Sequence, residues 1–551
     1  MGGPPNSQAV SLPTNLPFRL VSKTIGSGAY ASIKKATPFH APSPVIAVKF
    51  INKDHAFRTG HLRPKQIQLE ITHHASVCPH DNIIRFLSWG EDAAWIWLSL
   101  ELADGGDLFD KIEADEGVGE DVAHFYFAQL SSAISWCHGK GVAHRDVKPE
   151  NMLLSASGDL KLADFGLATR FLLPRTGERK SCGMVCGSPP YIAPEILAVG
   201  NANCKRKKDE EKSGYDPQVS DVWSCAIVLF VLLAGNTPWD SPVAEESYEY
   251  YDYVRTHGRP TDELWAKIPA EAMSLVRGML KVEPRERFTM QDVRKHLWFT
   301  RANPHLNAKG KVANPVSLAT QMLESLRIDF SAEIPVSQPS GEAMDVDSQL
   351  HHHQLASTQP ESPLAELPGF DWEATRPSLA RTTLLSASQP IHTTSITITT
   401  HLSSLLDTLS QDPSMSQFHP TPSVPLTLTQ QARQFTDIVP SHSLTRFLSL
   451  LPPSQLLPML TASLHRLNVP VAEPASLAAI EGTGSGSVRL RVKTRDARKQ
   501  ELQGEIVVER LGGEVLEVRF LKAKGDPVGW RRLFKQMAVL CKEGIVKPSA
   551  G

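Results

Sequence analysis

Hydrophobic and polar residues recur in regular patterns over two stretches of the chain, 16–300 and 436–547. In the first stretch, a β-rich alternating segment at 45–50 and an apolar segment at 95–101 predict strands. The longest apolar run, 225–234, is about half of the roughly 20 residues that cross a bilayer. We therefore expect this run to form a buried helix of a folded domain, and we expect no transmembrane segment.

The pattern of the second stretch predicts a small α+β domain. Leucines at helical spacing over 455–467 predict an amphipathic helix, and apolar residues at the same spacing over about 529–541 predict a last helix. Three strand patterns lie between them, at 488–494, 502–510 and 515–521. The predicted order is helix, three strands, helix.

The composition changes at about residue 300. Pro, Ser, Thr, Gln and His dominate 301–435, which has few long apolar patterns and is predicted to be a disordered linker. Residues 1–15 are rich in Pro, Gly and Ser and predict a disordered N-terminus. They lack the charged start and apolar run of a signal peptide.

Net charge and cysteine usage exclude some classes of function. A formal net charge of -2 over 551 residues argues against a mainly electrostatic nucleic-acid binder. Seven cysteines without a framework of regular spacings indicate a reducing, intracellular compartment. Cys182 and Cys186 lie close in sequence, but no second Cys/His pair stands at zinc spacing, so a metal site there is disfavoured.

The stretch 144–151, His-Arg-Asp-Val-Lys-Pro-Glu-Asn, carries the clearest chemistry. Pro149 blocks a regular helix, so the stretch is predicted to be a loop. The Asp146 carboxylate can take a proton from an alcohol, and the Asn151 amide oxygen can hold a divalent cation. The stretch matches the protein-kinase catalytic-loop pattern, and Asp164 of an Asp-Phe-Gly triplet follows where a second magnesium ligand is expected.

A glycine-rich stretch near the start is predicted to cover phosphates, because glycines let backbone N–H groups approach closely. It departs mildly from the kinase pattern, with Ala31 in place of the third glycine and Ile33 in place of valine. The predicted nucleotide-binding residues of this stretch are Ile25, Gly26, Ser27, Gly28, Ala29, Tyr30, Ala31, Ser32 and Ile33.

Lys49 ends an Ala-Val-Lys strand, as the phosphate-binding lysine of kinases does. Taken alone it would be a solvated strand lysine. Glu70, on the helix predicted to follow, is the preferred partner for Lys49, and Glu91 in a polar turn is the competitor.

The segment after the strand at 95–101 is predicted to be the hinge between two lobes. Backbone groups of Glu101 and Ala103 are expected to bond adenine, with Leu100 setting the depth of the pocket. Asp107 is expected near the ribose or the incoming peptide.

Three further expectations concern the region after the catalytic loop. Glu195 should pair with Arg287, and Asp221 should cap a helix start and brace the catalytic loop. The insertion 198–215 is predicted to be a solvated surface loop. Its four consecutive basic residues, 205–208, are either a nuclear-import patch or simply solvated.

Together these motifs resemble a protein kinase over about 16–299, and finer features resemble the checkpoint kinase 1 family. These finer features are the motifs at 105–112, 144–151, 164–169 and 186–195. The resemblance implies a bilobal α+β fold that uses ATP and Mg²⁺. It also implies a preference for Arg three residues before the Ser/Thr acceptor, read by Asp107 and Glu150, and Lys148 is expected to neutralise charge on the transferred phosphoryl group. The family has Thr where Ser188 stands.

Between residues 331 and 455 the chain carries eight Ser/Thr-Gln pairs, which resemble targets of phosphatidylinositol-3-kinase-like checkpoint kinases. They begin at Ser337, Ser348, Thr358, Ser388, Ser410, Ser416, Thr429 and Ser454. Ser337 and Ser388 resemble the two regulatory Ser-Gln-Pro sites of the family. The C-terminal domain resembles a kinase-associated-1 domain, which in that family folds back on the kinase and inhibits it.

A basic patch at Lys493, Arg495, Arg498 and Lys499 would hold an acidic surface or anionic lipid, or is an exposed polar hairpin.

The sequence thus predicts a Ser/Thr protein kinase of the DNA-damage checkpoint, located in the nucleus and also in the cytoplasm. Its expected partners are protein substrates such as cell-cycle phosphatases, upstream checkpoint kinases and its own tail, without direct nucleic-acid binding. One alternative is a metabolic or polarity kinase with a kinase-associated-1 tail. Another is a pseudokinase scaffold, which is disfavoured because Lys49, Asp146, Asn151 and Asp164 are all present.

Overall fold

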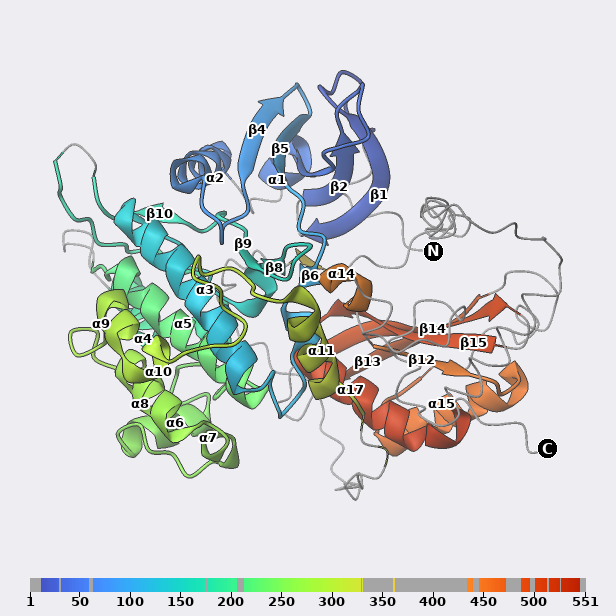
Figure 1. Ribbon diagram of the computed structural model, residues 1–551. Coiled ribbons are helices and arrows are strands. Elements are labelled where there is room, and N and C mark those ends of the chain that lie inside the picture. The colour runs from blue at the N-terminus through green and yellow to red at the C-terminus, as the bar shows by residue number, and fades with distance from the viewer. Residues whose placement is uncertain are drawn as a thin grey trace.

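A sheet-rich lobe, a helical lobe and a smaller α+β domain make up the fold (Figure 1). The computed structural model describes residues 11–28, 31–58, 63–173, 176–205, 213–328, 330, 360–361, 434–439, 445–471, 487–495, 501–512, 515–525 and 527–545. The predicted bilobal α+β fold is confirmed.

The N-terminal lobe is an antiparallel sheet with two helices. The strands, in spatial order, are β11 (Pro360–Glu361), β1 (Arg19–Gly28), β2 (Ala31–Thr37), β3 (Ile46–Asn52), β5 (Trp95–Glu101) and β4 (Phe86–Glu91). The helices are α1 (Lys53–Arg58) and α2 (Pro64–Val77). Side chains on both faces of β3 and β5 are buried, so neither strand has one buried and one exposed face.

The helical lobe surrounds α5 (Pro217–Ala234), the helix predicted from the longest apolar run. Its other helices are α3 (Glu120–Gly139), α4 (Pro194–Lys205), α6 (Tyr248–Arg255), α7 (Glu263–Ala266), α8 (Ala270–Met279), α9 (Met290–Lys295) and α10 (Leu297–Thr300). Short strands connect the lobes: β6 (Gly106–Asp107), β7 (Val142–Ala143), β8 (Met152–Leu154), β9 (Leu160–Leu162) and β10 (Thr169–Arg170). Single 3₁₀ turns are η2 (Phe109–Lys111), η3 (Pro149–Asn151) and η4 (Pro189–Tyr191).

Helix α5 (Pro217–Ala234) begins and ends with clear local signals. The Asp216 side chain accepts the Gln218 N–H as N-cap, Pro217 fixes the first turn, and Gly235 ends the helix in the left-handed conformation at φ 68°. Asp221 therefore lies inside the helix, and the prediction that it caps the helix start was wrong. By length and composition α5 is apolar enough to cross a membrane, but 89% of it is buried within the protein, as expected of a core helix.

The predicted start of the linker at residue 301 was also wrong. Residues 301–326 continue the helical lobe, and α11 (Pro315–Ser325) packs on α3 with Leu318, Met322 and Leu323 in the core. This short helix has four buried apolar residues, too few to stand out from the sequence around it. The last residue of the predicted linker, Phe435, also belongs to the folded part of the chain. It begins α14 (Phe435–Ile438), which packs into the core of the helical lobe.

The C-terminal domain is a four-stranded antiparallel sheet packed against two helices. The strands, in spatial order, are β12 (Arg446–Ser449), β15 (Val515–Lys524), β14 (Glu501–Gly512) and β13 (Ser487–Arg495). The helices are α15 (Pro453–Arg466) and α17 (Pro527–Leu540), followed by the turn η7 (Lys542–Gly544). Both helices and three strands confirm the predicted elements, and β12 is an additional edge strand.

Helix α17 joins the C-terminal domain to the helical lobe beside η2 (Figure 1). Val528 packs into the core of the lobe. Arg531, with its side chain 4% exposed, pairs with Glu113 at 3.0 Å. Arg532 and Lys535 pair with Asp115 at 2.7 Å and Glu116 at 3.2 Å at the margin. A basic side of one helix thus meets an acidic loop of the lobe.

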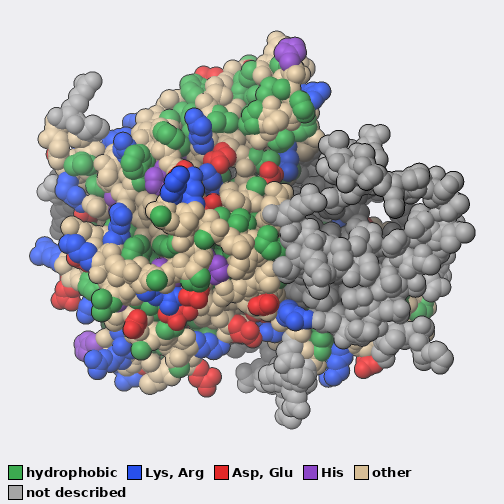
Figure 2. Space-filling view, viewed as in Figure 1, with side chains coloured by type: hydrophobic (Ala, Val, Ile, Leu, Met, Phe, Trp, Pro, Cys, Tyr) green, Lys and Arg blue, Asp and Glu red, His purple; other side chains and the backbone are tan. Residues whose placement is uncertain are grey.

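The outer face of β13 carries the predicted basic patch. Lys493 pairs with Glu501 at 3.0 Å, and Arg495 is exposed at the end of the strand. Arg498 and Lys499 lie outside the described residues. On the face of the kinase lobes seen in Figure 2, acidic and basic side chains are interspersed rather than segregated by sign.

Candidate active site

Four side chains of the catalytic loop and the segment at 188 form one closed group. The Lys148 ammonium lies 3.0 Å from the Asp146 carboxylate and donates to Ser188 Oγ at 2.8 Å. Ser188 Oγ in turn donates to Asp146 Oδ1 at 3.1 Å, and the Asn151 amide donates to Asp146 Oδ2 at 3.1 Å. Each contact fixes the orientation of the Asp146 carboxylate, which is the group predicted to accept a proton.

The electrostatics of Lys148 follow from this arrangement. Burial favours the neutral amine, but the Asp146 and Glu150 carboxylates outweigh that effect and raise the pKa of Lys148 above its ordinary value. Lys148 is therefore a permanent cation beside Asp146, in a place where water is largely excluded.

Asp221 holds the catalytic loop from below, as predicted. Its carboxylate accepts the backbone N–H of His144 at 2.8 Å and that of Arg145 at 2.8 Å. His138 bonds the same carboxylate at 2.9 Å. Arg145 adopts a left-handed conformation with φ 65°, which is unfavourable for a non-glycine residue. The two hydrogen bonds from Asp221 hold the backbone in this conformation directly before Asp146.

The predicted Lys49–Glu70 pair forms. Lys49 Nζ on β3 lies 2.7 Å from Glu70 Oε1 on α2 and 3.5 Å from Asp164 Oδ1. Burial raises the pKa of Glu70, although the Lys49 charge acts in the opposite direction. The competing partner Glu91 instead pairs with Lys53 at 2.7 Å. The two lobes are therefore linked by one lysine that contacts both α2 and the Asp164 segment.

Phe165, next to Asp164, is held by two imidazole rings. His74 of α2 stacks on Phe165 with ring centroids 4.6 Å apart, and His144 approaches it edge-on at 4.9 Å. His74 bonds the Ile84 carbonyl at 2.7 Å, and burial lowers its pKa to about 4. Asp164 has φ 60°, a strained conformation that presents its carboxylate toward Lys49.

Strand register places the glycine-rich stretch beside Lys49. Gly26 pairs with Ile33 across β1 and β2, and Ile33 pairs with Lys49 across β2 and β3. Ala31 and Ser32 are buried on β2. Ala29 and Tyr30 lie outside the described residues, as do the side chains of 26–28.

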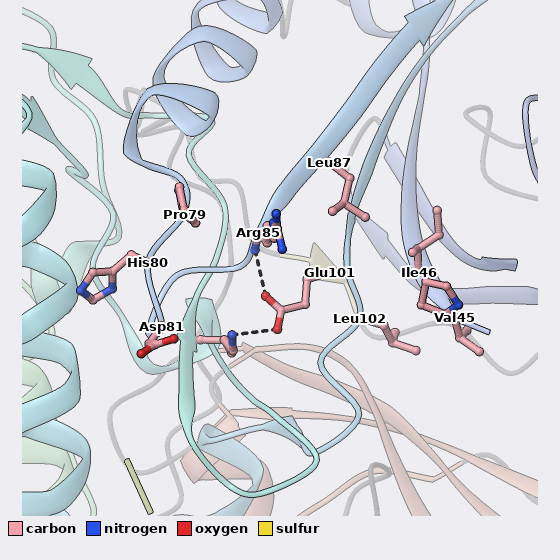
Figure 3. A pocket seen from close by; sticks show the side chains of 11 residues that line it. Val45, Ile46, Pro79, His80, Asp81, Arg85, Leu87, Glu101 and Leu102 are labelled. Carbon is pink, nitrogen blue, oxygen red and sulfur yellow. Dashed lines mark hydrogen bonds and ion pairs between the residues drawn. The ribbon is translucent and has the colours of Figure 1, made fainter. Parts of the chain in front are cut away.

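The hinge separates the predicted nucleotide side from a cavity of about 700 Å³ behind it. Figure 3 shows the Glu101 side chain pointing into this cavity, where it accepts the Arg85 N–H at 3.0 Å and pairs with Lys161 at 2.7 Å. Leu102 and Leu87 form part of its apolar wall. The Glu101 side chain thus faces away from Lys49, and its predicted contribution to adenine binding rests on its backbone alone.

Asp107 and Glu150 lie within electrostatic range of each other. Burial raises the pKa of Asp107 well above its ordinary value, and the nearby Asp110 and Glu150 charges add to that shift. Asp107 Oδ1 accepts the Phe109 N–H at 2.7 Å. A carboxyl group with a raised pKa beside a second carboxylate would be stabilised as the anion by an incoming cation.

Comparison with known proteins identifies the family that shares this geometry. Residues 20–299 match the family described as "Protein kinase domain". The chain is 36% identical over 537 residues to "Serine/threonine-protein kinase chk1" of Schizosaccharomyces pombe, covering 97% of each chain. It is 34% identical to "Serine/threonine-protein kinase CHK1" of Saccharomyces cerevisiae, over 96% of this chain and 97% of the relative.

The chain belongs to the checkpoint kinase 1 family of serine/threonine protein kinases. A plant relative, "CBL-interacting protein kinase 9" of Oryza sativa, is 35% identical but covers only 51% of this chain. Likeness to the plant kinase thus spans about the kinase half, whereas likeness to the checkpoint kinases includes the linker and the C-terminal domain.

A protein kinase domain uses ATP, and the donor set near Lys49 fits a magnesium–nucleotide complex. Asn151 and Asp164 supply amide and carboxylate oxygens, and Mg²⁺ in kinases is bound by one or two such groups together with phosphate oxygens and water. Among the described residues no three His, Cys, Asp or Glu side chains form a metal-holding group. The nucleotide phosphates would therefore complete the coordination.

Two site residues were missed or assigned differently in the sequence. Ser188 was noted only as the residue where the family has Thr, but it is 4% exposed and its hydroxyl is bonded to Asp146. His74 carried no motif, and the signal for it was its position four residues after Glu70, on the same side of α2. Ser337 and Ser388, the predicted regulatory sites, lie outside the described residues.

Proposed function

We propose that this kinase acts in the DNA-damage and replication checkpoint and phosphorylates cell-cycle regulators at Arg-x-x-Ser/Thr sites. The observation that carries the catalytic part is the joining of Asp146, Lys148 and Ser188 in one bonded group, with Lys49 held between Glu70 and Asp164. The first group suits an attacking alcohol, and the second suits a polyphosphate.

Each side chain has a defined task in phosphoryl transfer. Asp146 orients the substrate hydroxyl and receives its proton, while Lys148 neutralises negative charge that develops nearby. Lys49, held by Glu70, binds the α- and β-phosphates, and Asn151 and Asp164 bind Mg²⁺. When bound, the magnesium–nucleotide complex supplies the phosphoryl group and a charge that stabilises its transfer. The protein contributes mainly position and preorganised charge.

Selection of Arg in the substrate rests on Asp107 and Glu150. Burial raises the pKa of Asp107, the Asp110 and Glu150 charges add to that shift, and a guanidinium is a suitable counter-ion for this acidic surrounding. Glu150 lies on η3, two residues after Lys148 of the catalytic loop. A substrate Arg bound to Glu150 would therefore lie near the acceptor residue.

Regulation by the tail is supported by the contact of α17 with the kinase lobe. Arg531 and Arg532 bond Glu113 and Asp115, a few residues after Asp107 on the same segment. A domain seated there would hinder protein substrates. We propose that phosphorylation of Ser337 and Ser388 by phosphatidylinositol-3-kinase-like checkpoint kinases favours its release. We also propose a nuclear and partly cytoplasmic location.

Two substitutions test the catalytic assignment. Asp146→Ala and Lys49→Arg should each abolish transfer to an Arg-x-x-Ser peptide, because one removes the proton acceptor and the other misplaces the phosphate-binding cation. Thermal unfolding checks that both variants fold. Lys53→Arg, a matched change on the lysine that pairs with Glu91, should leave turnover unchanged. Retained turnover in either of the first two variants would contradict the roles.

Peptide pairs test the substrate preference. Glu150→Gln should raise KM for an Arg-x-x-Ser peptide by about ten- to a hundredfold, the range for losing one charge-assisted contact. KM for an Ala-x-x-Ser peptide should be unaffected. An equal effect on both peptides would show that Glu150 does not read the Arg.

Truncation tests the regulatory part. Because residues 301–326 belong to the helical lobe and Ile328 to the core of the C-terminal domain, the chain should be cut after residue 327 rather than near 300. We expect higher activity toward protein substrates in the truncated chain. Unchanged activity would exclude inhibition by the C-terminal domain, whereas the catalytic assignment would stand.

A further inference from the structure

The Arg145 guanidinium is buried next to two thiols of the activation segment, the stretch between Asp164 and Glu195. Its Nη1 donates to Cys182 Sγ at 2.9 Å and to the Tyr215 hydroxyl at 3.4 Å, and its Nε donates to the Leu167 carbonyl at 2.7 Å. Arg145 is 7% exposed. Arg145 directly precedes Asp146, and its backbone N–H donates to Asp221. A shift of Arg145 would therefore move the catalytic loop.

Arg145 differs from the other buried arginines that the structure describes. Arg287, Arg446 and Arg531 each contact a carboxylate, at 2.7 Å, 3.1 Å and 3.0 Å respectively. Within the described part of the chain, no carboxylate lies within ion-pair distance of the Arg145 side chain. A buried cation is costly without a counter-ion, and the Arg145 guanidinium instead contacts the Cys182 sulfur.

Cys182 is fixed to this cation by its backbone. Its N–H donates to the Tyr215 carbonyl at 2.8 Å, and its carbonyl accepts the Tyr215 N–H at 2.9 Å. The Tyr215 hydroxyl donates to the Met184 carbonyl at 2.8 Å. The thiol is nevertheless only partly buried, so small reagents can reach it.

The other described thiols lack these conditions. Cys137, Cys186, Cys225 and Cys541 are buried, and burial raises their pKa, to about 11 for Cys186 and Cys541. Cys78 is partly buried like Cys182, but burial raises its pKa as well, and no arginine side chain donates to its sulfur in the described structure. Reactive cysteines are partly exposed and lie beside a cation, since the thiolate is the nucleophile.

We propose that Cys182 is an oxidant-sensitive modification site that acts through Arg145 on the activation segment. In the reaction with hydrogen peroxide, the Cys182 thiolate attacks one peroxide oxygen. An S–O bond forms, the O–O bond breaks, and hydroxide leaves. Sulfur is oxidised by two electrons to the sulfenic acid, and peroxide is reduced. A thiol reductant reverses the step and releases water.

The consequence for activity rests on the proposed kinase function. Oxidation adds an oxygen to the sulfur that accepts the Arg145 hydrogen bond, so the tie between the catalytic loop and the activation segment weakens. Activity should fall about tenfold, as for the loss of one charge-assisted hydrogen bond, and return on reduction. Cys186 is a poor resolving thiol because it is buried, so the sulfenic acid is the expected product rather than a disulfide.

The full-length kinase is tested in a Cys204→Ser background, because the Cys204 side chain lies outside the described residues. The reduced protein is treated with hydrogen peroxide, trapped with dimedone and mapped by mass spectrometry, a readout that needs no kinase activity. Cys182 should be labelled about tenfold faster than Cys78. Equal labelling of the two, or a Cys182–Cys186 disulfide in place of the adduct, would overturn the assignment.

Activity after peroxide separates the modification from its effect. Cys182→Ser should no longer respond to peroxide, whereas Cys78→Ser should respond like the parent. Cys182→Asp supplies a permanent anion to Arg145 and should be active with or without peroxide, which a purely structural role for the sulfur does not predict. Equal peroxide inactivation of Cys182→Ser and the parent would overturn the regulatory effect. A parent that is inactive before oxidation would instead count against the proposed kinase function.

Discussion

The ion pairs inside the helical lobe and those between α17 and the lobe use the same residue types but differ in burial. Arg287 binds Glu195 through both guanidinium nitrogens, at 2.7 and 3.0 Å, with its side chain fully buried. At the α17 contact, only Arg531 is comparably buried. Its neighbours Arg532 and Lys535 are more exposed and pair with Asp115 and Glu116, which are 41% and 63% exposed, although Lys535 also contacts the buried Glu113 at 3.1 Å.

This difference indicates what each contact is for. A buried, bidentate pair is expensive to break, because either partner alone would be an uncompensated charge, so it suits a permanent frame. A contact with one buried pair and a solvated margin can separate, because water and salt replace the marginal pairs at little cost. The buried pairs of this frame are thus costlier to break than the marginal pairs of the docked domain.

The largest effect should come from the frame. Arg287→Ala removes the Glu195 pair and the contact over the Trp223 ring, at 5.0 Å, and leaves Glu195 without its counter-ion. We expect the free energy of unfolding of the kinase domain to fall by about 3–5 kcal/mol, measured by denaturant unfolding. Lys311→Ala, at an exposed pair with Asp81, is the control and should change stability far less. Similar losses in both variants would remove the distinction between buried and marginal pairs.

The pairs of the frame were predictable from sequence because each partner sits in a motif. Lys49, Glu70, Glu195 and Arg287 are recognised by their local neighbours, and a known fold then fixes which of them meet. The C-terminal elements were predictable for a different reason: their periodicity is strong, so pattern alone defines helices and strands.

The contacts that the sequence did not reveal join ordinary residues over long separations. Arg531 meets Glu113 across 418 positions, and neither lies in a motif that names the other. Phe435 packs against Gly158, where a Cβ would lie 2.6 Å from its ring, although the surrounding sequence resembles a linker. The Arg145–Cys182 contact depends on how the activation segment folds back to Tyr215. Such pairings follow from tertiary packing, which no local pattern encodes.

An intermediate effect on stability should come from lowering the pH, and it should act on the kinase domain rather than on the α17 contact. The pKa of His74 is lowered to about 4 by burial, against about 6.5 when unfolded. Between pH 4 and 6.5 the unfolded chain binds a proton at His74 that the folded chain does not, so stability falls as the pH drops through this window. The full change is about 3 kcal/mol.

His74→Leu tests this linkage through the slope of stability against pH rather than through stability itself. The parent should lose stability steadily from pH 6.5 to pH 4, measured by thermal unfolding in a series of buffers. The variant should show a shallower slope, because it has no imidazole to protonate. An identical slope in both proteins would mean that the His74 ring is already solvated in the folded kinase.

The smallest effect should appear at the margin of the α17 contact. Arg532→Ala removes a partly exposed pair worth about 0.2–1 kcal/mol, so the docked fraction should change at most about fivefold. Hydrogen exchange at the amides of 113–117 reports docking, since α17 covers this loop. Exchange there should also quicken as salt is raised, because marginal pairs are screened, whereas exchange in α5 should not. Arg531→Ala, at the buried pair, should expose the loop far more than Arg532→Ala does. If the two variants behave alike, or salt has no effect, the contact is held by the apolar packing of Val528 and its neighbours instead of by charge.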